Sequence, residues 1–373
     1  MDHSVGDTTI EKMLIQQAAR QQQPINGSIE LLPLCNMNCD MCYVRLSRKE
    51  MEQQGHLHKA EEWIQLGREM KDAGVLFLLL TGGEPLLFPD FKKLYLELMQ
   101  MGMILTINTN GTLIDEDWAH FFGQYKPRRI NITLYGADDV AYETLCHYPG
   151  GYAKTIKGIQ RLKNEGVDVK INGSVTKQNK KDMKRIYAIG QELHIPVHMD
   201  TYMLPGLHER KKTYEEQSRL GPVEAARADM ETLKTEFHPE AFHQYVNHSI
   251  YNVQNADHSY TRQISCLAGN CSFTINWKGE MRPCVVLPKP SIRVFETGFS
   301  SAWNQLSTES KEFLLNSKCS TCSLRPICKT CVASALLETD SYDGVPDYLC
   351  QYTEEFLRLL FIEKKHLTTS EQK

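Results

Sequence analysis

The residues of this chain that are best suited to chemistry are its twelve cysteines. Three lie close together in Cys35-Asn-Met-Asn-Cys39-Asp-Met-Cys42, with three and then two residues between them. Three thiolates on one short loop can hold three irons of a four-iron cubane and leave the fourth iron open to another ligand. A structural zinc site needs four ligands, and no fourth cysteine or histidine follows at a usual spacing. The loop therefore predicts an iron–sulfur cluster.

Eight further cysteines lie near the C-terminus. Their spacing is Cys266-x4-Cys271-x12-Cys284, then Cys319-x2-Cys322-x5-Cys328-x2-Cys331, then Cys350. Zinc ribbons separate their cysteine pairs by about 15–20 residues, which is wider than the gap found here, so two further iron–sulfur cubanes fit the pattern better. Gly279 lies shortly before Cys284, where we expect a hairpin turn. Cys146 is left over, and we predict that it is a small buried side chain rather than a metal ligand.

Strands and helices alternate along the middle of the chain. We expect strands at 29–34, 76–81, 104–110, 130–136, 167–175 and 196–202, and helices at 59–73, 90–101, 115–122 and 180–193. Helical sequence also lies on both sides of the Pro-Gly-Gly-Tyr turn at 149–152 and fills most of 205–262. Strands that alternate with helices predict a parallel sheet with right-handed crossovers.

The later strands alternate between polar and apolar residues. Asn131, Thr133 and Tyr135 share one face, and the residues between them are apolar. An open parallel sheet with helices on both faces would be apolar throughout. One polar face predicts a curved sheet with helices outside and a ligand-filled interior. The fold class we predict is α/β, a partial (β/α)6 TIM-like barrel with a C-terminal cysteine-rich domain.

Composition narrows the classes of partner. The chain has 373 residues, 24% of them charged, and a net charge of -4, which gives no reason to expect nucleic acid or an anionic membrane as partner. No apolar run is long enough to span a bilayer, and the first residues lack a secretory signal. We therefore expect a cytoplasmic protein. We divide it into an N-terminal tail or short helix (1–25), the barrel (26–204), a helical linker (205–262), the cysteine-rich domain (263–352) and a C-terminal helix or tail (353–373).

The cysteine loop resembles that of radical S-adenosylmethionine (SAM) enzymes, and the resemblance covers most of the chain. Gly82-Gly83-Glu84-Pro85 is similar to the family motif that orients the SAM amino group, and Asn108-Thr109-Asn110-Gly111 closes the third strand as in many members. Met41 stands where relatives commonly carry an aromatic residue, and Thr133 where they often carry a serine. The resemblance implies SAM contacts from Met41, Gly82, Gly83, Glu84, Pro85, Asn108, Asn110, Thr133 and Asn172.

The C-terminal cysteines resemble the SPASM extension of these enzymes, which carries two auxiliary 4Fe–4S clusters. The resemblance implies one cluster on Cys266, Cys271, Cys284 and Cys331, and another on Cys319, Cys322, Cys328 and Cys350. With the loop cluster, this makes three 4Fe–4S clusters. The chain departs from the usual form in having two residues rather than three between Cys328 and Cys331. Because both auxiliary clusters would be fully ligated, we expect them to transfer electrons.

Two branches of SPASM enzymes compete as models for the substrate. Sulfatase-maturating enzymes, which make formylglycine, typically have an aspartate after the cysteine that matches Cys284, where this chain has Val285. Residues 134–152 and the Arg-x-Gly-Pro-x-Glu-Ala-Ala run at 219–226 resemble maturases that build thioether or carbon–carbon links in ribosomal peptides. We predict such a maturase, with sulfatase maturation as the alternative. A non-enzymatic iron–sulfur carrier or scaffold is a further alternative, against which Gly-Gly-Glu-Pro argues.

The expected partners and catalytic residues follow from this prediction. The partners are a precursor peptide and an external one-electron reductant of the flavodoxin or ferredoxin type. Only about 25 residues precede the first strand, so leader recognition would use other surfaces or a separate protein. His198, Asp200 and Tyr202 are the candidates for acid–base or positioning roles, because active sites gather where barrel strands end. A polar lining without chemistry is the alternative for these three.

Overall fold

The structure is a computed structural model that describes residues 9–203, 213, 215–264 and 266–370. Its sheet has nine strands in the order β6-β5-β4-β3-β2-β1-β7-β8-β9. Six strands form the predicted barrel: β1 (Asn26–Glu30), β2 (Phe77–Thr81), β3 (Ile104–Thr109), β4 (Arg129–Thr133), β5 (Val169–Ser174) and β6 (Val197–Asp200). They pair in parallel, each with the next. The alternation of strand and helix in the sequence thus predicted this part of the fold correctly.

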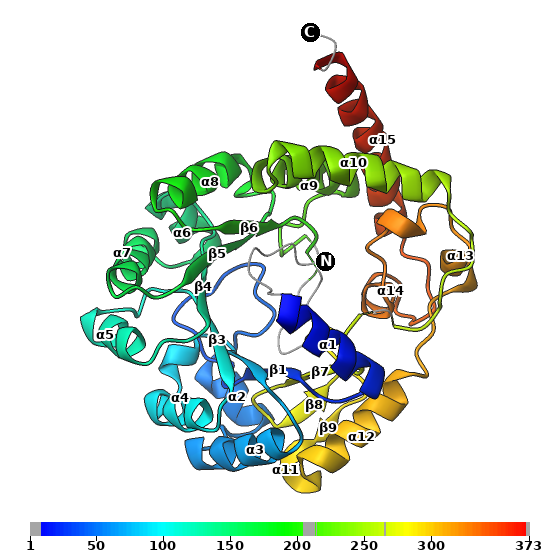
Figure 1. Cartoon of the computed structure of the whole chain (residues 1–373). Coiled ribbons are helices and arrows are strands. Elements are labelled where there is room, and N and C mark those ends of the chain that lie inside the picture. The colour runs from blue at the N-terminus through cyan, green and yellow to red at the C-terminus, as the bar shows by residue number, and fades with distance from the viewer. Residues whose placement is uncertain (1–8, 204–212, 214, 265, 371–373) are drawn as a thin grey trace.

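Helices cover the outer face of the curved sheet (Figure 1). They are α2 (Arg48–Gln54), α3 (Ala60–Asp72), the short η1 (Pro85–Leu87), α4 (Phe91–Gln100), α5 (Glu116–Gln124), α6 (Asp139–Cys146), α7 (Gly151–Asn164), η2 (Lys180–Asp182) and α8 (Met183–Glu192). Ile130, Ile132 and Leu134 are fully buried beneath these helices. Asn131, Thr133 and Tyr135 are only partly buried. The predicted apolar and polar faces of β4 are therefore the outer and inner faces of the barrel.

The C-terminal region continues the barrel sheet. β7 (Ser272–Ile275) pairs in parallel with β1, and β8 (Glu280–Arg282) and β9 (Ile292–Arg293) follow in antiparallel order. Gly279 has a φ of 76° in the turn between β7 and β8, which confirms the predicted hairpin. Three strands therefore extend the six that the sequence predicted.

The remaining helices precede the first strand of the barrel or follow its sixth strand in the sequence. They are α1 (Thr9–Gln21), α9 (Pro222–Glu236), α10 (Pro239–Gln254), α11 (Val294–Thr297), α12 (Phe299–Ser310), α13 (Ser317–Ser320), η3 (Arg325–Ile327), α14 (Val332–Thr339) and α15 (Asp347–Ser370). Ala18 of α1 packs with Ile25, Phe77 and Cys271, so α1 covers the ends where β1, β2 and β7 begin. In Figure 1, α13 and α14 lie between the two edges of the sheet. Within the described residues, no helix is long and apolar enough to cross a membrane.

The first strand ends earlier than expected. The prediction was 29–34, whereas β1 ends at Glu30. Leu31 still donates its N–H to the carbonyl of Thr81 (2.9 Å), but the carbonyl of Leu32 accepts from Gly83 (2.7 Å) and that of Leu34 from Glu84 (2.9 Å). The segment is extended because it pairs with the turn after β2 instead of with a strand. This pairing carries the chain into the cysteine loop.

Candidate active site

The strands of the barrel end around a cavity of about 440 Å³. Cys35, Cys39 and Cys42 line it together with Gly82, Gly83, Asn108 and Thr133. Asp200, Tyr202 and Val285 lie in the same wall. The structure thus brings the predicted cluster loop, several predicted SAM contacts and two of the three catalytic candidates into one site.

The cysteine loop directs N–H groups toward its sulfur atoms. The backbone N–H of Met37 donates to Cys35 Sγ (3.4 Å), and that of Arg45 donates to Cys42 Sγ (3.3 Å). The side-chain amide of Asn110 donates to Cys35 Sγ (3.7 Å). Hydrogen-bond donors around a sulfur favour its thiolate form and tune a bound iron–sulfur cluster. This arrangement fits a cluster held by the three thiolates.

The segment from Leu145 to His147 fixes the middle of the loop. Asn38 and Asp40 donate their N–H groups to the carbonyls of Cys146 and Leu145, both at 3.0 Å. His147 Nε2 lies 2.7 Å from Asp40 Oδ1. Cys146 is fully buried, as its sequence context predicted. The predicted peptide-maturase-like stretch 134–152 therefore supports the cysteine loop directly.

Burial raises the pKa of two of the loop thiols. It is the main cause that raises the pKa of Cys35 to about 12, and the Glu84 carboxylate adds to it. A hydrogen bond with Cys146, followed by burial, raises the pKa of Cys39 well above its usual range. Such thiols become thiolates when a metal binds them. Among the described residues no three side chains are grouped to hold a single metal ion, whereas in a cubane each thiolate binds its own iron.

The Gly-Gly-Glu-Pro turn packs against the segment that leads into the loop. A Cβ on Gly82 or Gly83 would collide with the backbone of Leu32 or Leu34, and Gly82 has a φ of 137°. Glycine is therefore required at these positions. The close approach places the backbone of both glycines on the cavity wall next to the cysteines.

Glu84 points away from the cavity and into the protein. Its carboxylate accepts hydrogen bonds from Thr109 Oγ1 (2.7 Å), the N–H of Asn110 (2.8 Å) and the N–H of Leu86 (3.2 Å). Complete burial raises the pKa of Glu84 to about 7 even though these bonds act to lower it. Glu84 thus joins the turn after β2 to the end of β3, and the buried Pro85 begins η1 behind it.

The other predicted SAM contacts differ in their placement. Met41, Asn108, Asn110 and Thr133 line the cavity. Asn172 is paired with Thr133 in the sheet, and its side-chain oxygen is buried and accepts no hydrogen bond from the described residues. A buried acceptor of this kind is costly unless a ligand or water satisfies it. The inner face of β4 and β5 thus fits a polar ligand.

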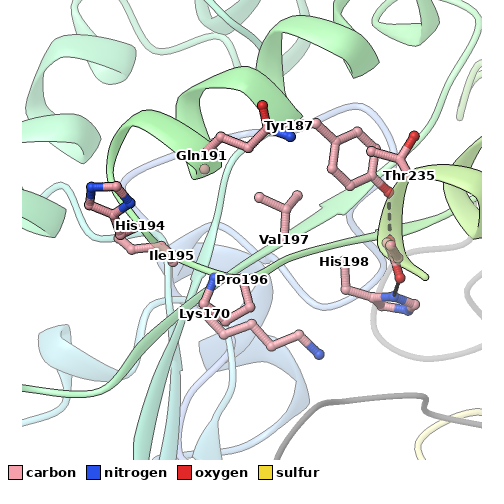
Figure 2. Close-up of a pocket in the computed structure, with 11 residues that line it drawn as sticks. Lys170, Tyr187, Gln191, His194, Ile195, Pro196, Val197, His198 and Thr235 are labelled. Carbon is pink, nitrogen blue, oxygen red and sulfur yellow. Dashed lines mark hydrogen bonds and ion pairs between the residues drawn. The ribbon is translucent and has the colours of Figure 1, made fainter. Parts of the chain in front are cut away.

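The three catalytic candidates do not line one cavity, although the sequence placed them on one face of the strand. Asp200 and Tyr202 line the active-site cavity, and Tyr202 donates its hydroxyl to Glu338 Oε1 (3.0 Å). His198 lies nearer the start of β6 and lines a second cavity of about 510 Å³ with Glu236 and Lys170 (Figure 2). His198 instead contacts Glu236 of α9 at 3.0 Å, in a cavity whose wall includes residues of α8 and α9.

The C-terminal cysteines influence one another electrostatically. Burial raises the pKa of Cys271 and Cys284 to about 11, and the charge of Cys266 adds to both; Cys331 also acts on Cys284 and Cys266. Burial likewise raises the pKa of Cys350 to about 11, with contributions from Cys328, Cys319 and Cys322. These influences link Cys266 with Cys271, Cys284 and Cys331, and Cys350 with Cys319, Cys322 and Cys328.

Several residues of the site were not predicted. Asn36 joins Asn110 (2.8 Å) and Thr112 (2.8 Å), which links the cysteine loop to the end of β3. Tyr43 and Tyr135 add aromatic surface to the cavity wall. Asn36 lies between Cys35 and Cys39, and Thr112 follows Asn-Thr-Asn-Gly. Their positions beside these motifs could have identified them as residues of the site. Glu236 and Glu338 come from distant helices and carried no such signal.

Residues 29–189 match the Radical SAM superfamily. This chain carries a radical SAM domain. The match covers β1 to most of α8, and with it the cysteine loop and the Gly-Gly-Glu-Pro turn. Residues 29–189 thus make this protein an enzyme with a radical SAM domain, and that domain implies SAM and a 4Fe–4S cluster in the site described above. The carrier or scaffold alternative is excluded.

Similar proteins act on different substrates. An AdoMet-dependent heme synthase of Methanosarcina barkeri is 23% identical over 84% of this chain and 92% of its own length. The antilisterial bacteriocin subtilosin biosynthesis protein AlbA of Bacillus subtilis is 24% identical over 75% of this chain and 60% of its own length. Among solved structures, Streptococcus suis SuiB bound to its precursor peptide SuiA matches 94% of this chain and 84% of its own, with a TM-score of 0.64 and 20% identity. The last likeness concerns the fold alone.

Proposed function

We propose that this enzyme is a maturase that forms a thioether or carbon–carbon crosslink in a ribosomally synthesised peptide. The observation that carries the proposal is the character of the cavity wall. Met37, Tyr43, Val44, Met203 and Val286 give it a large apolar and aromatic surface. Asp200 is the one side chain of the aspartate, glutamate, lysine or arginine type among the described residues that line it. Such a wall suits an apolar or aromatic peptide side chain.

The heme synthase relative supports a second candidate, a tetrapyrrole substrate. Heme-type porphyrins carry carboxylates, and proteins usually bind carboxylates with arginine or lysine. No arginine or lysine occurs among the described residues that line the cavity, and Asp200 would repel a carboxylate. This contrast favours the peptide over the porphyrin.

The sulfatase-type alternative lacks a proton acceptor next to Cys284. Val285 and Val286 follow this cysteine and both line the cavity. Neither can take a proton from a substrate cysteine or serine. General-base help of this kind is typically worth about 10²–10⁴-fold in rate. The apolar pair is therefore better suited to packing against a peptide than to formylglycine formation.

In the proposed reaction the cofactors supply the radical, and the residues of the chain bind SAM, position the peptide and accept a proton. When bound, the loop cluster and SAM supply a 5′-deoxyadenosyl radical that takes a hydrogen atom from a peptide carbon. Gly82, Gly83, Asn108 and Thr133 would hold SAM against the loop, and Asn110 would keep Cys35 oriented through its amide. Tyr43, Tyr135 and Tyr202 would position the peptide and exclude water, and Asp200 would accept the proton that bond formation releases.

The two C-terminal cysteine sets support a proposal of two auxiliary 4Fe–4S clusters. Each set has four thiols, which is the number that saturates one cubane. Saturated clusters suit electron transfer from the substrate site to an external one-electron carrier of the flavodoxin or ferredoxin type. We further propose that the leader of the precursor is recognised outside the cavity or by a separate protein.

The proposal is tested by presenting the reconstituted enzyme with three substrates under reducing, anaerobic conditions. The first is a short cysteine- or aromatic-rich peptide, to be sought among the open reading frames around this gene. The others are a sulfatase-derived Cys-x-Pro-x-Arg peptide and iron coproporphyrin. We expect the first to lose two hydrogens per link, with fragmentation suppressed inside the ring, and the other two to remain unchanged. Formylglycine in the second peptide or decarboxylation of the porphyrin would contradict the proposal.

A further inference from the structure

A buried ion pair lies next to the active-site cavity. Glu338 of α14 and Arg219, which precedes α9, meet at two points: Arg219 Nη2 donates to Glu338 Oε1 (2.7 Å), and Nη1 donates to Oε2 (3.3 Å). The side chain of Arg219 is 4% exposed and that of Glu338 is 7% exposed. Neither is among the described residues that line the cavity. The pair therefore acts on a bound substrate only through a residue that does line it.

Tyr202 connects the ion pair with the cavity. Tyr202 lines the cavity wall, and its hydroxyl donates to Glu338 Oε1 (3.0 Å), the same oxygen that accepts from Arg219. The guanidinium of Arg219 lies 5.2 Å from the ring centroid of Tyr202 and 3.3 Å from that of Tyr348. Tyr348 in turn donates its hydroxyl to the carbonyl of Leu220 (2.9 Å). Tyr202 is thus held both at its hydroxyl and at its ring.

The burial of two charges at this place needs a reason other than stability. A buried ion pair has to offset the desolvation of both groups, and an apolar pair of similar volume is often as stable or more stable. An ionised carboxylate, however, accepts a shorter and stronger hydrogen bond than a neutral group does. Such a bond fixes the direction of the hydroxyl that donates it. The ion pair is therefore well suited to orient Tyr202.

We propose that Glu338, itself oriented by Arg219, is a positioning residue that holds the ring of Tyr202 in the wall against which the substrate packs. This inference rests on the proposed function, in which Tyr202 positions the peptide. Because Glu338 occupies the hydroxyl, Tyr202 presents its ring to the cavity, and an aromatic ring suits an apolar or aromatic peptide side chain. Glu338 touches no reacting atom and acts through Tyr202.

The proposed contact joins the barrel to the cysteine-rich region. Tyr202 follows β6, whereas Glu338 lies on α14, the helix that Cys331 caps at its N-terminus. Tyr348 lies on α15, two residues before Cys350. One part of the substrate wall is therefore oriented by helices that carry proposed auxiliary-cluster ligands. Substrate affinity should depend on this region even though its cysteines lie outside the barrel.

The first test follows Tyr202 in the reconstituted, full-length enzyme without a peptide. Tyrosine labelled with ¹³C at Cζ, the ring carbon that bears the hydroxyl, is incorporated, and the NMR signal that is lost in Tyr202→Phe identifies Tyr202. We expect Glu338→Gln to shift this signal, because the hydroxyl loses its charged acceptor. The matched control is Glu354→Gln, which removes the same charge from an exposed position of α15 and should leave the signal unmoved. A Tyr202 signal that Glu338→Gln also leaves unmoved overturns the proposal.

The second test measures crosslinking of the candidate precursor peptide. Tyr202→Phe keeps the ion pair and the ring and removes only the hydroxyl, so its result stands even where Glu338→Gln fails to fold. We expect each variant to raise KM by about tenfold, the low end of what a hydrogen bond to a charged group is worth, with a smaller fall in kcat. Because both substitutions remove one and the same hydrogen bond, the double variant should raise KM no further.

Two kinetic results would overturn the proposal. A kcat that falls while KM keeps its wild-type value would show that the ion pair only maintains the folded enzyme. A double variant whose effect on KM is the product of the two single effects would show that Glu338 does not act through Tyr202. A wild-type enzyme that crosslinks no candidate peptide would contradict the proposed function, and the NMR signal of Tyr202 would then decide the positioning role by itself.

Discussion

The two cysteine-rich regions are built in different ways. In the N-terminal loop, Met37, Cys39 and Met41 are buried in the main core of the protein. In the C-terminal region, Cys284 and Cys319 pack against a small core of five buried residues, Leu287, Leu315, Val332, Ala333 and Ala335. α13 and η3, which lie among these cysteines, have four and three residues. The barrel therefore shapes the first site, whereas the proposed auxiliary clusters would contribute much of the stability of the second region.

The largest effect is expected from the N-terminal loop. The triple variant Cys35→Ala/Cys39→Ala/Cys42→Ala should retain its fold, because hydrogen bonds and the main core hold the loop. Its iron content should fall from roughly twelve to roughly eight per chain, since each cubane holds four. Cleavage of SAM to 5′-deoxyadenosine with dithionite should become undetectable. An unchanged iron content would contradict the three-cluster assignment.

Replacing one of the C-terminal cysteines that we propose as cluster ligands should instead weaken the folded structure of that region. Cys350→Ala should cost about four irons and increase backbone deuterium exchange over residues 317–339. Exchange over residues 35–46 and cleavage of SAM should stay near wild type, since the barrel supports that loop. Anaerobic exchange mass spectrometry measures both regions in one sample. An equal increase of backbone deuterium exchange over residues 35–46 and 317–339 would contradict the proposed difference in how the two regions are stabilised.

The pH dependence of stability at Glu84 provides a test of how much the barrel stabilises the first site. The folded protein keeps the Glu84 proton up to a pKa of about 7, whereas the ordinary value is 4.5. Between these values the unfolded chain binds fewer protons, so the stability contributed by Glu84 is complete below pH 4.5 and is lost as pH rises toward 7. The stability of the wild type relative to Glu84→Gln should therefore fall across this window, as followed by thermal unfolding. A relative stability that rises with pH would show that the pKa is lowered instead.

The smallest effect is expected at Cys146. Cys146→Ala removes a buried sulfur and should cost about 1 kcal/mol of unfolding free energy in denaturant titrations. Iron content and SAM cleavage should remain near wild type, because the eight C-terminal thiols would saturate the two proposed auxiliary cubanes. Loss of about four irons would show that Cys146 is a ligand.

Local features of the site could be predicted from the sequence. The spacing of Cys35, Cys39 and Cys42 acts within one loop, and the alternation in 130–135 reflects the two faces of a single strand. The sequence predicts less about contacts between segments that are far apart along the chain. The parallel pairing of β7 with β1, which places Ser28 2.8 Å from Thr274, joins residues 246 positions apart. Local patterns carry no information on such a pairing.

The catalytic candidates show the same limit. Alternation correctly put His198 and Asp200 on one side of β6, but it could not reveal that the strand lies at the edge of the sheet. The position of α9 decides that His198 faces Glu236, 38 residues further along the chain. Packing against a helix that is distant in the sequence thus places His198 and Asp200, which share one face of β6, in two different cavities.

The central claim is that the radical takes hydrogen from a peptide carbon, and isotope transfer tests it most directly. The candidate precursor peptide is prepared with deuterium on its side-chain and Cα carbons and is incubated with enzyme, SAM and dithionite. We predict that 5′-deoxyadenosine gains one deuterium while the peptide loses two hydrogens per link. Unlabelled 5′-deoxyadenosine together with an unmodified peptide would contradict the account.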